Sequence, residues 1–221
     1  MADITSSLPG AASTSLRSRR SRSSHRVAKA VPKTAALPLV VDLDGTLIRS
    51  DLLIESAFAH LGQNPLRILG LLSALFRGKA ALKAHIAKAT AIDVTGLPYD
   101  ESVLALIRDA RAEGRPVYLV SASNERYVSA VAAHLGVFDG WFASDSSENL
   151  SSAAKADRLV SVFGGGGFDY LGNGEADLAV WKVARRCLAI RASAAVRAKL
   201  LEFAPDATLL ISGRSTLRAW A

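Results

Sequence analysis

The sequence predicts an α/β protein with a doubly wound, Rossmann-like parallel sheet and a small helical cap inserted after the first strand. Two observations predict this fold. From residue 38 onward, short apolar runs alternate with stretches of helical periodicity, which is typical of a parallel sheet covered by helices on both faces. A long helical stretch also separates the first two apolar runs. We interpret it as a cap over the carboxyl ends of the strands, where open α/β sheets bind ligands.

The first strand is predicted at residues 39–43 (LVVDL), and the turn residues Asp44-Gly45-Thr46 end it. The helical region from about residue 51 to residue 90 is interrupted at Asn64-Pro65 and at Arg77-Gly78, which predicts three helices of ordinary length. These helices and the connection that leads back to the sheet are predicted to form the cap, at about residues 51–95. The whole domain is predicted to span residues 37–221.

The alternation continues through the rest of the chain. Val103, Leu106, Ile107 and Ala110 have the spacing of one helix face, and Gly114 ends that helix. Helices are predicted at residues 102–112, 125–135, 152–163, 175–179 and 192–203, and strands at residues 116–120, 138–143, 168–171, 187–190 and 208–211.

The composition is that of a folded domain with a basic N-terminal segment. Of 221 residues, 50% are apolar and 21% are charged, which is enough to bury a sizeable core, and a single cysteine excludes a disulfide scaffold. Residues 1–36 hold seven basic residues and one acid, whereas residues 37–221 hold 20 basic and 19 acidic residues. The folded part therefore offers no broad basic surface, and we expect no specific nucleic-acid partner.

The Ser/Arg-rich residues 1–36 are predicted to form a disordered tail, because they have no amphipathic period. The tail suits a solvated leader, a misassigned start codon, an organellar transit peptide, or a polybasic contact with anionic lipid or nucleic acid. No stretch predicts a transmembrane segment: residues 66–76 (LRILGLLSALF) number 11 and include Arg67, whereas a spanning helix needs about 20 apolar residues. We predict a cytoplasmic protein, or one peripheral to a membrane.

Asp42 and Asp44 are candidates for chemistry because they stand two residues apart where the first strand ends. Alternation along a strand would direct both side chains to the same side of the sheet. Two carboxylates about 4 Å apart repel by about 4 kcal/mol at an effective dielectric near 20, so the pair predicts a cation, and Mg²⁺ suits oxygen ligands and phosphate. The alternative is a strand that ends in an Asp-Gly turn, with Thr46 capping the next helix.

Four later residues follow predicted strands or lie just beyond them. Ser121 could hold a phosphate oxygen, Lys155 could offset negative charge, and Asn173 and Asp177 could supply oxygen ligands. Each also has an ordinary interpretation: a helix N-cap or turn residue for Ser121, a surface lysine for Lys155, and a simple turn for Gly172-Asn173-Gly174.

Together and in this order, these segments resemble the haloacid dehalogenase superfamily of phosphatases and phosphotransferases. LVVDLDGT resembles its first motif, YLVSAS its second, Lys155 its third and YLGNGEAD its fourth. The helical insert resembles the small cap of the phosphoserine-phosphatase-like branch. More narrowly, VDLDGTLIRSDLL, SENLSSAAKADRL and YLGNGEADLAVW resemble the domain found ahead of UbiA-type membrane prenyltransferases.

The resemblance implies roles for named residues. Asp42 would be the nucleophile, Asp44 the general acid and base, and Mg²⁺ would be held by Asp42, Asp44 through its backbone carbonyl, Asn173 and Asp177. The transferring phosphate would be bound by Thr46, Ser121, Ala122 and Lys155. The superfamily usually has an acid in place of Asn173, so we expect weaker metal binding, with Asp177 contributing more.

The resemblance predicts an Mg²⁺-dependent phosphatase that hydrolyses a phosphomonoester through an aspartyl-phosphate. The apolar residues 66–76 and the prenyltransferase likeness favour a lipid-linked or prenyl phosphate as the substrate. For these apolar residues, the alternative is that they form the core of the cap itself, which is the commoner case. The alternative is a weakly active or inactive module that partners or regulates a membrane prenyltransferase. A nucleic-acid anchor in the basic tail is a third interpretation, which the absence of interleaved aromatic residues disfavours.

Overall fold

The computed structural model of the protein describes residues 36–50, 93–145 and 149–210. The three predicted cap helices, including residues 66–76, lie outside the described residues, as does the predicted tail apart from residue 36. None of the described helices has the length and hydropathy of a membrane-spanning segment.

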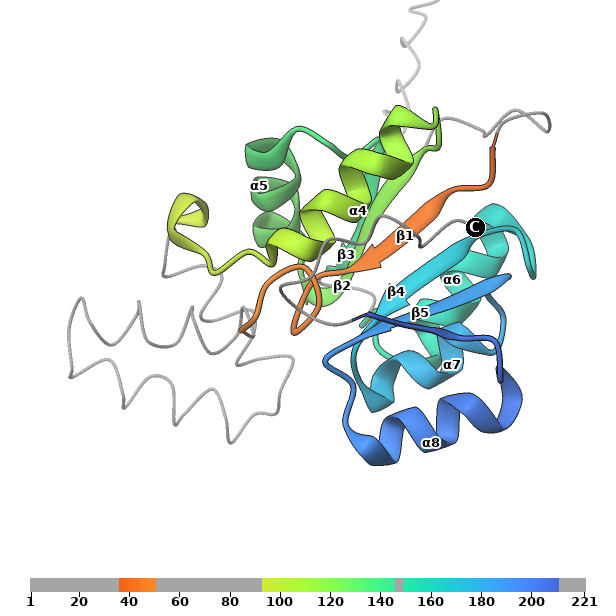
Figure 1. Ribbon diagram of the computed structural model, residues 1–221. Helices are drawn as coiled ribbons and strands as arrows, with labels where there is room; N and C mark the ends of the chain where they lie inside the picture. The colour runs from red at the N-terminus through yellow and green to blue at the C-terminus, as the bar shows by residue number, and fades with distance from the viewer. Residues whose placement is uncertain (1–35, 51–92, 146–148, 211–221) are drawn as a thin grey trace, which may run out of the picture.

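Six parallel strands form one sheet in the order β3-β2-β1-β4-β5-β6 (Figure 1). The strands are β1 (Leu39–Asp42), β2 (Val117–Asn124), β3 (Gly140–Ser144), β4 (Asp169–Gly172), β5 (Arg186–Ile190) and β6 (Thr208–Leu210). Each pair of neighbours is parallel. The predicted doubly wound parallel sheet is therefore confirmed.

The strand with the largest error in prediction is β2, which was expected to end at Val120 and continues to Asn124. The polar residues beyond Val120 carry no apolar strand signal, but pairing with β3 extends the strand. The register of that pairing shifts between Ser121 and Asn124. Irregularities of this kind are common beside active sites, where they redirect side chains.

The helices are α4 (Glu101–Ala112), α5 (Glu125–Leu135), α6 (Ala153–Phe163), α7 (Leu178–Trp181) and α8 (Ala194–Phe203), with 3₁₀ turns η2 (Val94–Gly96) and η3 (Glu175–Asp177). Most starts differ by one or two residues from prediction because capping side chains set them: Asp100 accepts from the backbone of Ser102 and Val103, and Ser193 from that of Val196. The helix predicted at residues 175–179 is instead the turn η3 followed by α7.

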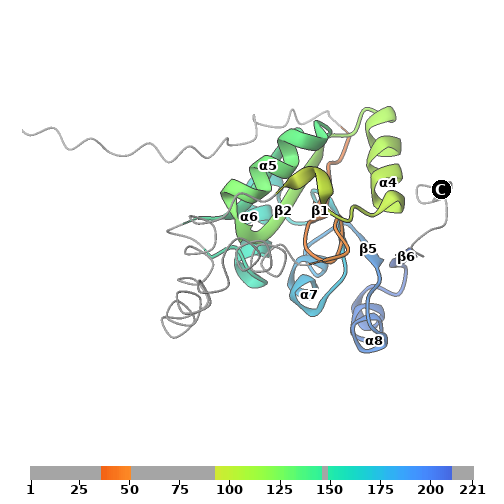
Figure 2. The ribbon, with the colours of Figure 1, turned by 90° about the vertical axis from the view of Figure 1, so that its left-hand side faces the viewer.

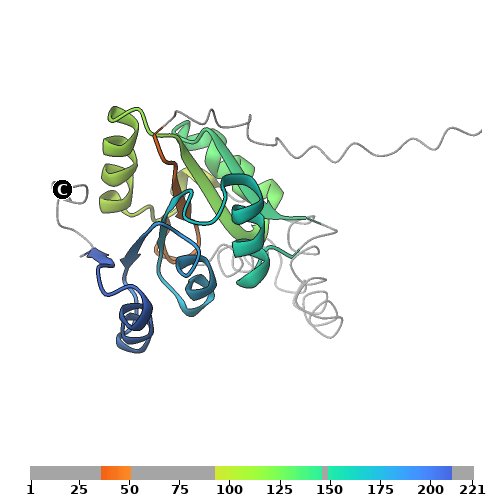
Figure 3. The same ribbon diagram turned by 90° about the vertical axis from the view of Figure 1, so that its right-hand side faces the viewer.

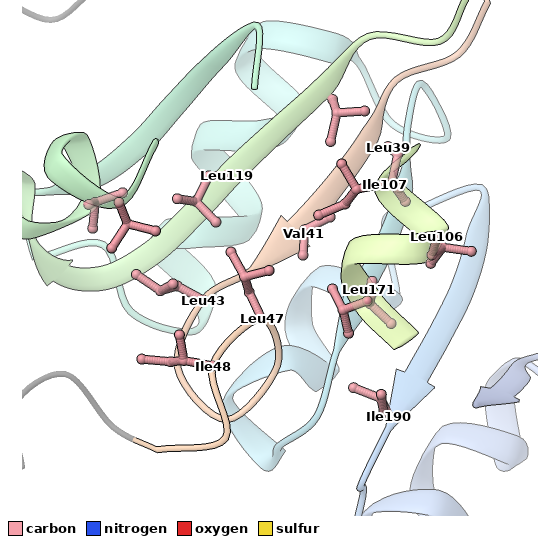
Figure 4. Close-up of a cluster of buried hydrophobic side chains, with 14 of the residues drawn as sticks. Leu39, Val41, Leu43, Leu47, Ile48, Leu106, Ile107, Leu119, Leu171 and Ile190 are labelled. Atoms are coloured by element: carbon pink, nitrogen blue, oxygen red, sulfur yellow. The ribbon is translucent and has the colours of Figure 1, made fainter. Parts of the chain in front are cut away.

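The core lies in two layers, one on each face of the sheet. Leu39 and Val41 of β1 pack in a cluster with Leu106 and Ile107 of α4 (Figure 4), whereas Val40 packs in a second cluster with residues of α6, α7 and α8. Figures 2 and 3 show α4 and α5 on the side of the sheet opposite to α7 and α8. Burial of each such aliphatic side chain stabilises the fold by about 1.5–3 kcal/mol.

The chain leaves β1 through a tight loop, residues 43–50, which is anchored to the segment that follows the predicted cap. Ile48 forms an antiparallel bridge with Tyr99, Arg49 N donates to the carbonyl of Pro98, and Asp100 N donates to that of Leu47. We call residues 47–49 and 98–100 the stem. Because Leu43, Leu47 and Ile48 are fully buried, hydrophobic packing holds the loop against the core.

The two ends of the sheet differ in chemistry. At the amino end, the buried carboxylate of Asp169 accepts from Arg115 at 2.6 Å and from Arg185 at 2.9 Å. At the carboxyl end, β1 lies between β2 and β4, where the chain reverses its direction of travel across the sheet. Doubly wound sheets bind ligands at this switch point.

Candidate active site

Asp42 and Lys155 form a buried ion pair at the carboxyl end of β1. Asp42, the last residue of the strand, is 5% exposed, and Lys155 of α6 is 3% exposed. Lys155 Nζ donates to Asp42 Oδ1 at 2.6 Å, and the Thr46 hydroxyl donates to Asp42 Oδ2 at 3.1 Å. The surface-lysine interpretation of Lys155 is therefore wrong, because its ammonium lies against the strand that carries Asp42.

Asp177 is the second carboxylate beside Lys155. Its Oδ1 accepts from Tyr170 Oη at 2.6 Å and from Lys155 Nζ at 3.3 Å. Its Oδ2 accepts from the backbone N–H groups of Asn173 and Gly174, at 2.9 and 3.0 Å. Asp177 therefore holds both Lys155 and the turn after β4 in place.

Asp44 is placed by the loop rather than by the strand. Because β1 ends at Asp42, strand alternation does not explain the position of Asp44, contrary to our expectation. The Asp44 carboxylate accepts from Ser121 Oγ at 2.6 Å and from Ser123 Oγ at 2.8 Å. Two serines of β2 therefore orient this carboxylate.

Ser121 is neither a helix cap nor a turn residue. It is fully buried within β2, and the cap of α5 is Asn124. Ser123 was missed in the sequence, although it stands two residues after Ser121 in the segment SAS. The residues after Val120 have no apolar pattern, so the extension of β2 that contains Ser123 was not predicted.

Asn173, in the turn after β4, contacts the loop of residues 43–50, so this turn is part of the site. The Thr46 hydroxyl lies 3.2 Å from Asn173 Oδ1, which also shows that Thr46 contacts the site rather than acting only as a helix cap. Gly45 has φ +74°, and a Cβ atom there would lie 2.3 Å from Asn173 Nδ2. Glycine is required here both by the left-handed backbone and by this close approach.

Ala122 lies beside these groups in β2. Its carbonyl accepts from Ser144 Oγ at 2.7 Å, which ties this part of β2 to the end of β3. Its predicted contact with phosphate stays a prediction.

The electrostatics of the site are dominated by burial and an excess of carboxylates. Burial raises the pKa of Asp42 to about 7, and the charges of Asp177 and Asp44 also raise it, while Lys155 opposes the shift. Burial lowers the pKa of Lys155, but attraction by Asp42 and Asp177 outweighs that effect and leaves the pKa raised. Asp42 and Asp177 thus share the Lys155 ammonium, with the Asp44 carboxylate also raising the pKa of Asp42. A bound cation would relieve the repulsion among these carboxylates.

Comparison with known proteins identifies the family of this chain. Residues 39–182, more than half of the chain, match the haloacid dehalogenase-like hydrolases. The chain belongs to this family. The matched residues run from the first residue of β1 to just beyond α7, so they include all the side chains of the candidate site described above.

Sequence comparison also finds a longer relative of this chain. The chain is 40% identical over 166 residues to an uncharacterized protein, y4nM, of Sinorhizobium fredii; the match covers 75% of this chain and 32% of that protein. The chain thus spans about a third of the length of this curated relative.

Two solved structures share the fold. Phosphoserine phosphatase in its apo form has a TM-score of 0.56 at 20% identity, with 81% of this chain and 94% of that chain covered. A phosphoserine phosphatase with a phospho-aspartyl intermediate analogue has a TM-score of 0.54 at 17% identity, with 82% and 95% covered. The two structures agree with this chain in fold, and the match over residues 39–182 confirms the resemblance to the haloacid dehalogenase superfamily. The prenyltransferase-linked subgroup stays a prediction.

The oxygen atoms around Asp42 suit a hard cation such as Mg²⁺. Asp42 Oδ2 and Asn173 Oδ1 both lie against the Thr46 hydroxyl, and Mg²⁺ is usually held by one or two carboxylates while it retains several waters. The described residues contain no group of three or more His, Cys, Asp and Glu side chains placed to hold a metal. The residues present therefore fit Mg²⁺ through Asp42 and Asn173, with the Asp44 carbonyl as the predicted third ligand.

The predicted metal contact of Asp177 meets an obstacle. Both of its oxygens already accept hydrogen bonds, from four donors in total. Direct ligation would require Asp177 to give up some of them. Support of Lys155 and of the Asn173 turn is the role that this geometry favours.

Proposed function

We propose that this chain is an Mg²⁺-dependent phosphatase that hydrolyses a phosphomonoester through an aspartyl-phosphate on Asp42. The observation that carries the proposal is the buried contact of 2.6 Å between Lys155 Nζ and Asp42 Oδ1 at the switch point of the sheet. An ordinary surface ion pair would leave both charged groups exposed to solvent. A carboxylate held by a buried ammonium, next to a second carboxylate oriented by two serines, suits nucleophilic catalysis.

In the first step, an Asp42 oxygen attacks phosphorus, and the bond from phosphorus to the leaving oxygen breaks. Asp44 protonates that oxygen as it leaves as an alcohol. In the second step, Asp44 takes a proton from water, the water oxygen attacks phosphorus, and the bond to Asp42 breaks to release inorganic phosphate. The hydrogen bonds of 2.6 and 2.8 Å from Ser121 and Ser123 support this role by orienting the Asp44 carboxylate.

The transferring phosphate is assigned to the donors near Asp42. Lys155 supplies a positive charge, while Thr46, Ser121 and the Ala122 region supply neutral polar groups. Mg²⁺, when bound by Asp42, Asn173 and the Asp44 carbonyl, would neutralise the charge that builds up on the phosphoryl oxygens.

A lipid-linked or prenyl phosphate is our proposal for the substrate, and it rests on the sequence alone. The apolar residues 66–76 that would face such a substrate lie outside the described residues. Partnership with a membrane prenyltransferase, with weak or absent catalysis, likewise stays a prediction.

The test is hydrolysis of p-nitrophenyl phosphate, phosphoserine and a short prenyl phosphate, each with Mg²⁺ and with EDTA. Wild-type protein should require Mg²⁺, and Asp42→Asn should lose at least several hundred-fold in turnover, because the nucleophile is gone. Asp157→Asn is the matched control: this exposed carboxylate lies two residues from Lys155 on the same helix. If Asp42→Asn retained activity within a few-fold of wild type, the proposed function would be wrong.

A further inference from the structure

Arg191, just beyond the carboxyl end of β5, reaches across to the loop after β1. One guanidinium nitrogen donates to the carbonyls of Gly45 and Thr46, at 2.7 and 2.6 Å. The other donates to the carboxylate of Asp100. The side chain thus joins three parts of the chain: β5, the loop that carries Asp44, and the stem.

The backbone of Arg191 is in the left-handed region, with φ +51°. Residues other than glycine rarely adopt this conformation, and it persists only where the surroundings hold it. Here the three contacts of the guanidinium provide that support. An unfavourable backbone conformation that these contacts hold in place indicates that the contacts between Arg191 and the loop have a function.

Asp100 gives Arg191 a rigid support. Its side chain is fully buried, caps the start of α4 through Ser102 N at 2.9 Å, and accepts from Arg49 Nε at 3.3 Å. Its own backbone N–H is bonded to the carbonyl of Leu47 at 2.9 Å. Asp100 therefore fixes Arg191 relative to both halves of the stem.

The contacts of Arg191 complement the hydrogen bonds within the loop. The N–H groups of Gly45 and Thr46 donate within the loop, to the carbonyls of Ser50 and Leu43. The carbonyls of the same two residues accept from Arg191. On either side of Gly45, the Asp44 carboxylate meets Ser121 and Ser123, and the Thr46 hydroxyl meets Asp42.

We propose that Arg191 is a positioning residue that clamps the Gly45 and Thr46 carbonyls and thereby sets where Asp44 and Thr46 stand relative to Asp42. Its contacts described above reach two loop carbonyls and Asp100, so the clamp acts on Asp44 and Thr46 through the loop backbone. The inference rests on the proposed function for its catalytic consequence but not for the clamp itself.

Three variants test the clamp. Arg191→Asn removes the guanidinium but tolerates a left-handed backbone, and Arg191→Lys keeps the charge but cannot span three oxygens. Arg185→Asn is the matched control, because Arg185 precedes the same strand and bonds a buried aspartate, Asp169, at the opposite end of the sheet.

Amide hydrogen exchange and phosphatase kinetics are measured for each variant and compared with its melting temperature. In Arg191→Asn, amide hydrogen exchange in residues 43–50 should rise by about tenfold relative to α5 and β3, and kcat for p-nitrophenyl phosphate should fall by about 10–100-fold with KM changed by less than about threefold. Arg191→Lys should be intermediate in both. Arg185→Asn should lower the melting temperature without either effect.

Uniformly faster exchange across all elements in Arg191→Asn, with kcat unchanged, would reduce Arg191 to a stabilising residue and overturn the proposal. Unchanged exchange in residues 43–50 would also overturn it. If wild type has no phosphatase activity and Asp42→Asn does not differ from it, the proposed function fails, and exchange alone then decides whether the clamp exists.

Discussion

Asn173 stands where the resemblance to the haloacid dehalogenase superfamily leads us to expect an acidic residue. It supplies an amide oxygen, without charge, beside Asp42 and the Thr46 hydroxyl. The site already has three carboxylates against one ammonium in the described residues. An amide there limits repulsion in the metal-free protein and weakens the attraction for a cation.

Asn173→Asp should tighten Mg²⁺ binding by on the order of tenfold, because one more charge near the ion contributes about 1–2 kcal/mol after screening. Isothermal calorimetry measures the affinity, and turnover at low Mg²⁺ should rise with it. Asp157→Asn, at an exposed position, is the control for a change of one charge unit outside the site, of the opposite sign. Unchanged affinity would show that residue 173 does not face the ion.

Asp42 should make the stability of the metal-free protein depend on pH. Its ordinary pKa of 3.8 applies to the unfolded chain, whereas burial raises the pKa in the folded state to about 7. The folded state therefore binds the proton more tightly, and the free energy of unfolding falls as the pH rises from about 4 to about 7.

Urea unfolding in EDTA at pH 5 and pH 8 measures this effect. Wild type should lose at least about 1 kcal/mol across this range, and Asp42→Asn should lose clearly less because residue 42 no longer titrates. Saturating Mg²⁺ should reduce the loss in wild type, since it favours ionised Asp42. Equal pH dependence in the two proteins would contradict the role assigned to burial.

At the scale of elements, the loop after β1 is the feature that brings the site together. It contacts the turn after β4 through Thr46, β2 through Asp44, and Tyr99 through Ile48. Because Gly45 has no Cβ, Asn173 can lie close to the loop. This close approach allows the contact of Thr46 with Asn173 and the contact of Asp44 with β2 to form together.

Gly45→Ala separates backbone strain from this close approach when it is compared with Gly114→Ala. Gly45 and Gly114 have nearly equal φ values, +74° and +73°, but a Cβ at Gly114 would meet nothing within 4 Å. Gly114→Ala should cost about 1–2 kcal/mol of stability through left-handed strain alone and leave phosphatase activity unchanged.

Gly45→Ala should cost more stability than Gly114→Ala and should lower kcat by at least about tenfold, because Asn173 and the loop must move apart. Chemical denaturation and p-nitrophenyl phosphate hydrolysis supply both measurements. If the two variants behaved alike, the contact between Gly45 and Asn173 would have no functional weight.

At the scale of the whole molecule, hydrogen bonds hold the segment before β1 against the amino end of the sheet. The Leu37 carbonyl accepts from Arg115 Nε at 2.9 Å, and the Pro38 carbonyl accepts from Asp169 N at 3.0 Å. Both bonds join the segment before β1 to the ion-pair cluster around Asp169.

Removal of residues 1–36 should therefore leave the melting temperature and turnover unchanged, because those residues have no apolar period. Removal of residues 1–38 should lower the melting temperature by at least about 3 °C, or about 1 kcal/mol for a chain of this size, since both carbonyls are lost. Differential scanning calorimetry compares the two truncations. A comparable loss in the shorter truncation would show that residues 1–36 contribute to the fold.

The order of strands and helices, and the first carboxylate of the site, were readable from the sequence. Apolar runs such as LVV before Asp42 record burial on both faces of a parallel strand, and this signal is local in the chain. The polar candidates Ser121, Lys155, Asn173 and Asp177 could be named because each follows such a run or a helix start nearby.

Only the tertiary structure decided how these residues meet. The Lys155 to Asp42 and Ser121 to Asp44 contacts join residues 113 and 77 positions apart, and Ser123, Tyr170 and Arg191 carry no local pattern that marks them. Hydrophobic periodicity reports which face of an element is buried, but it does not report which polar atoms satisfy one another inside the fold. Those pairings depend on strand order, loop conformation and the cost of leaving a buried polar group without a partner.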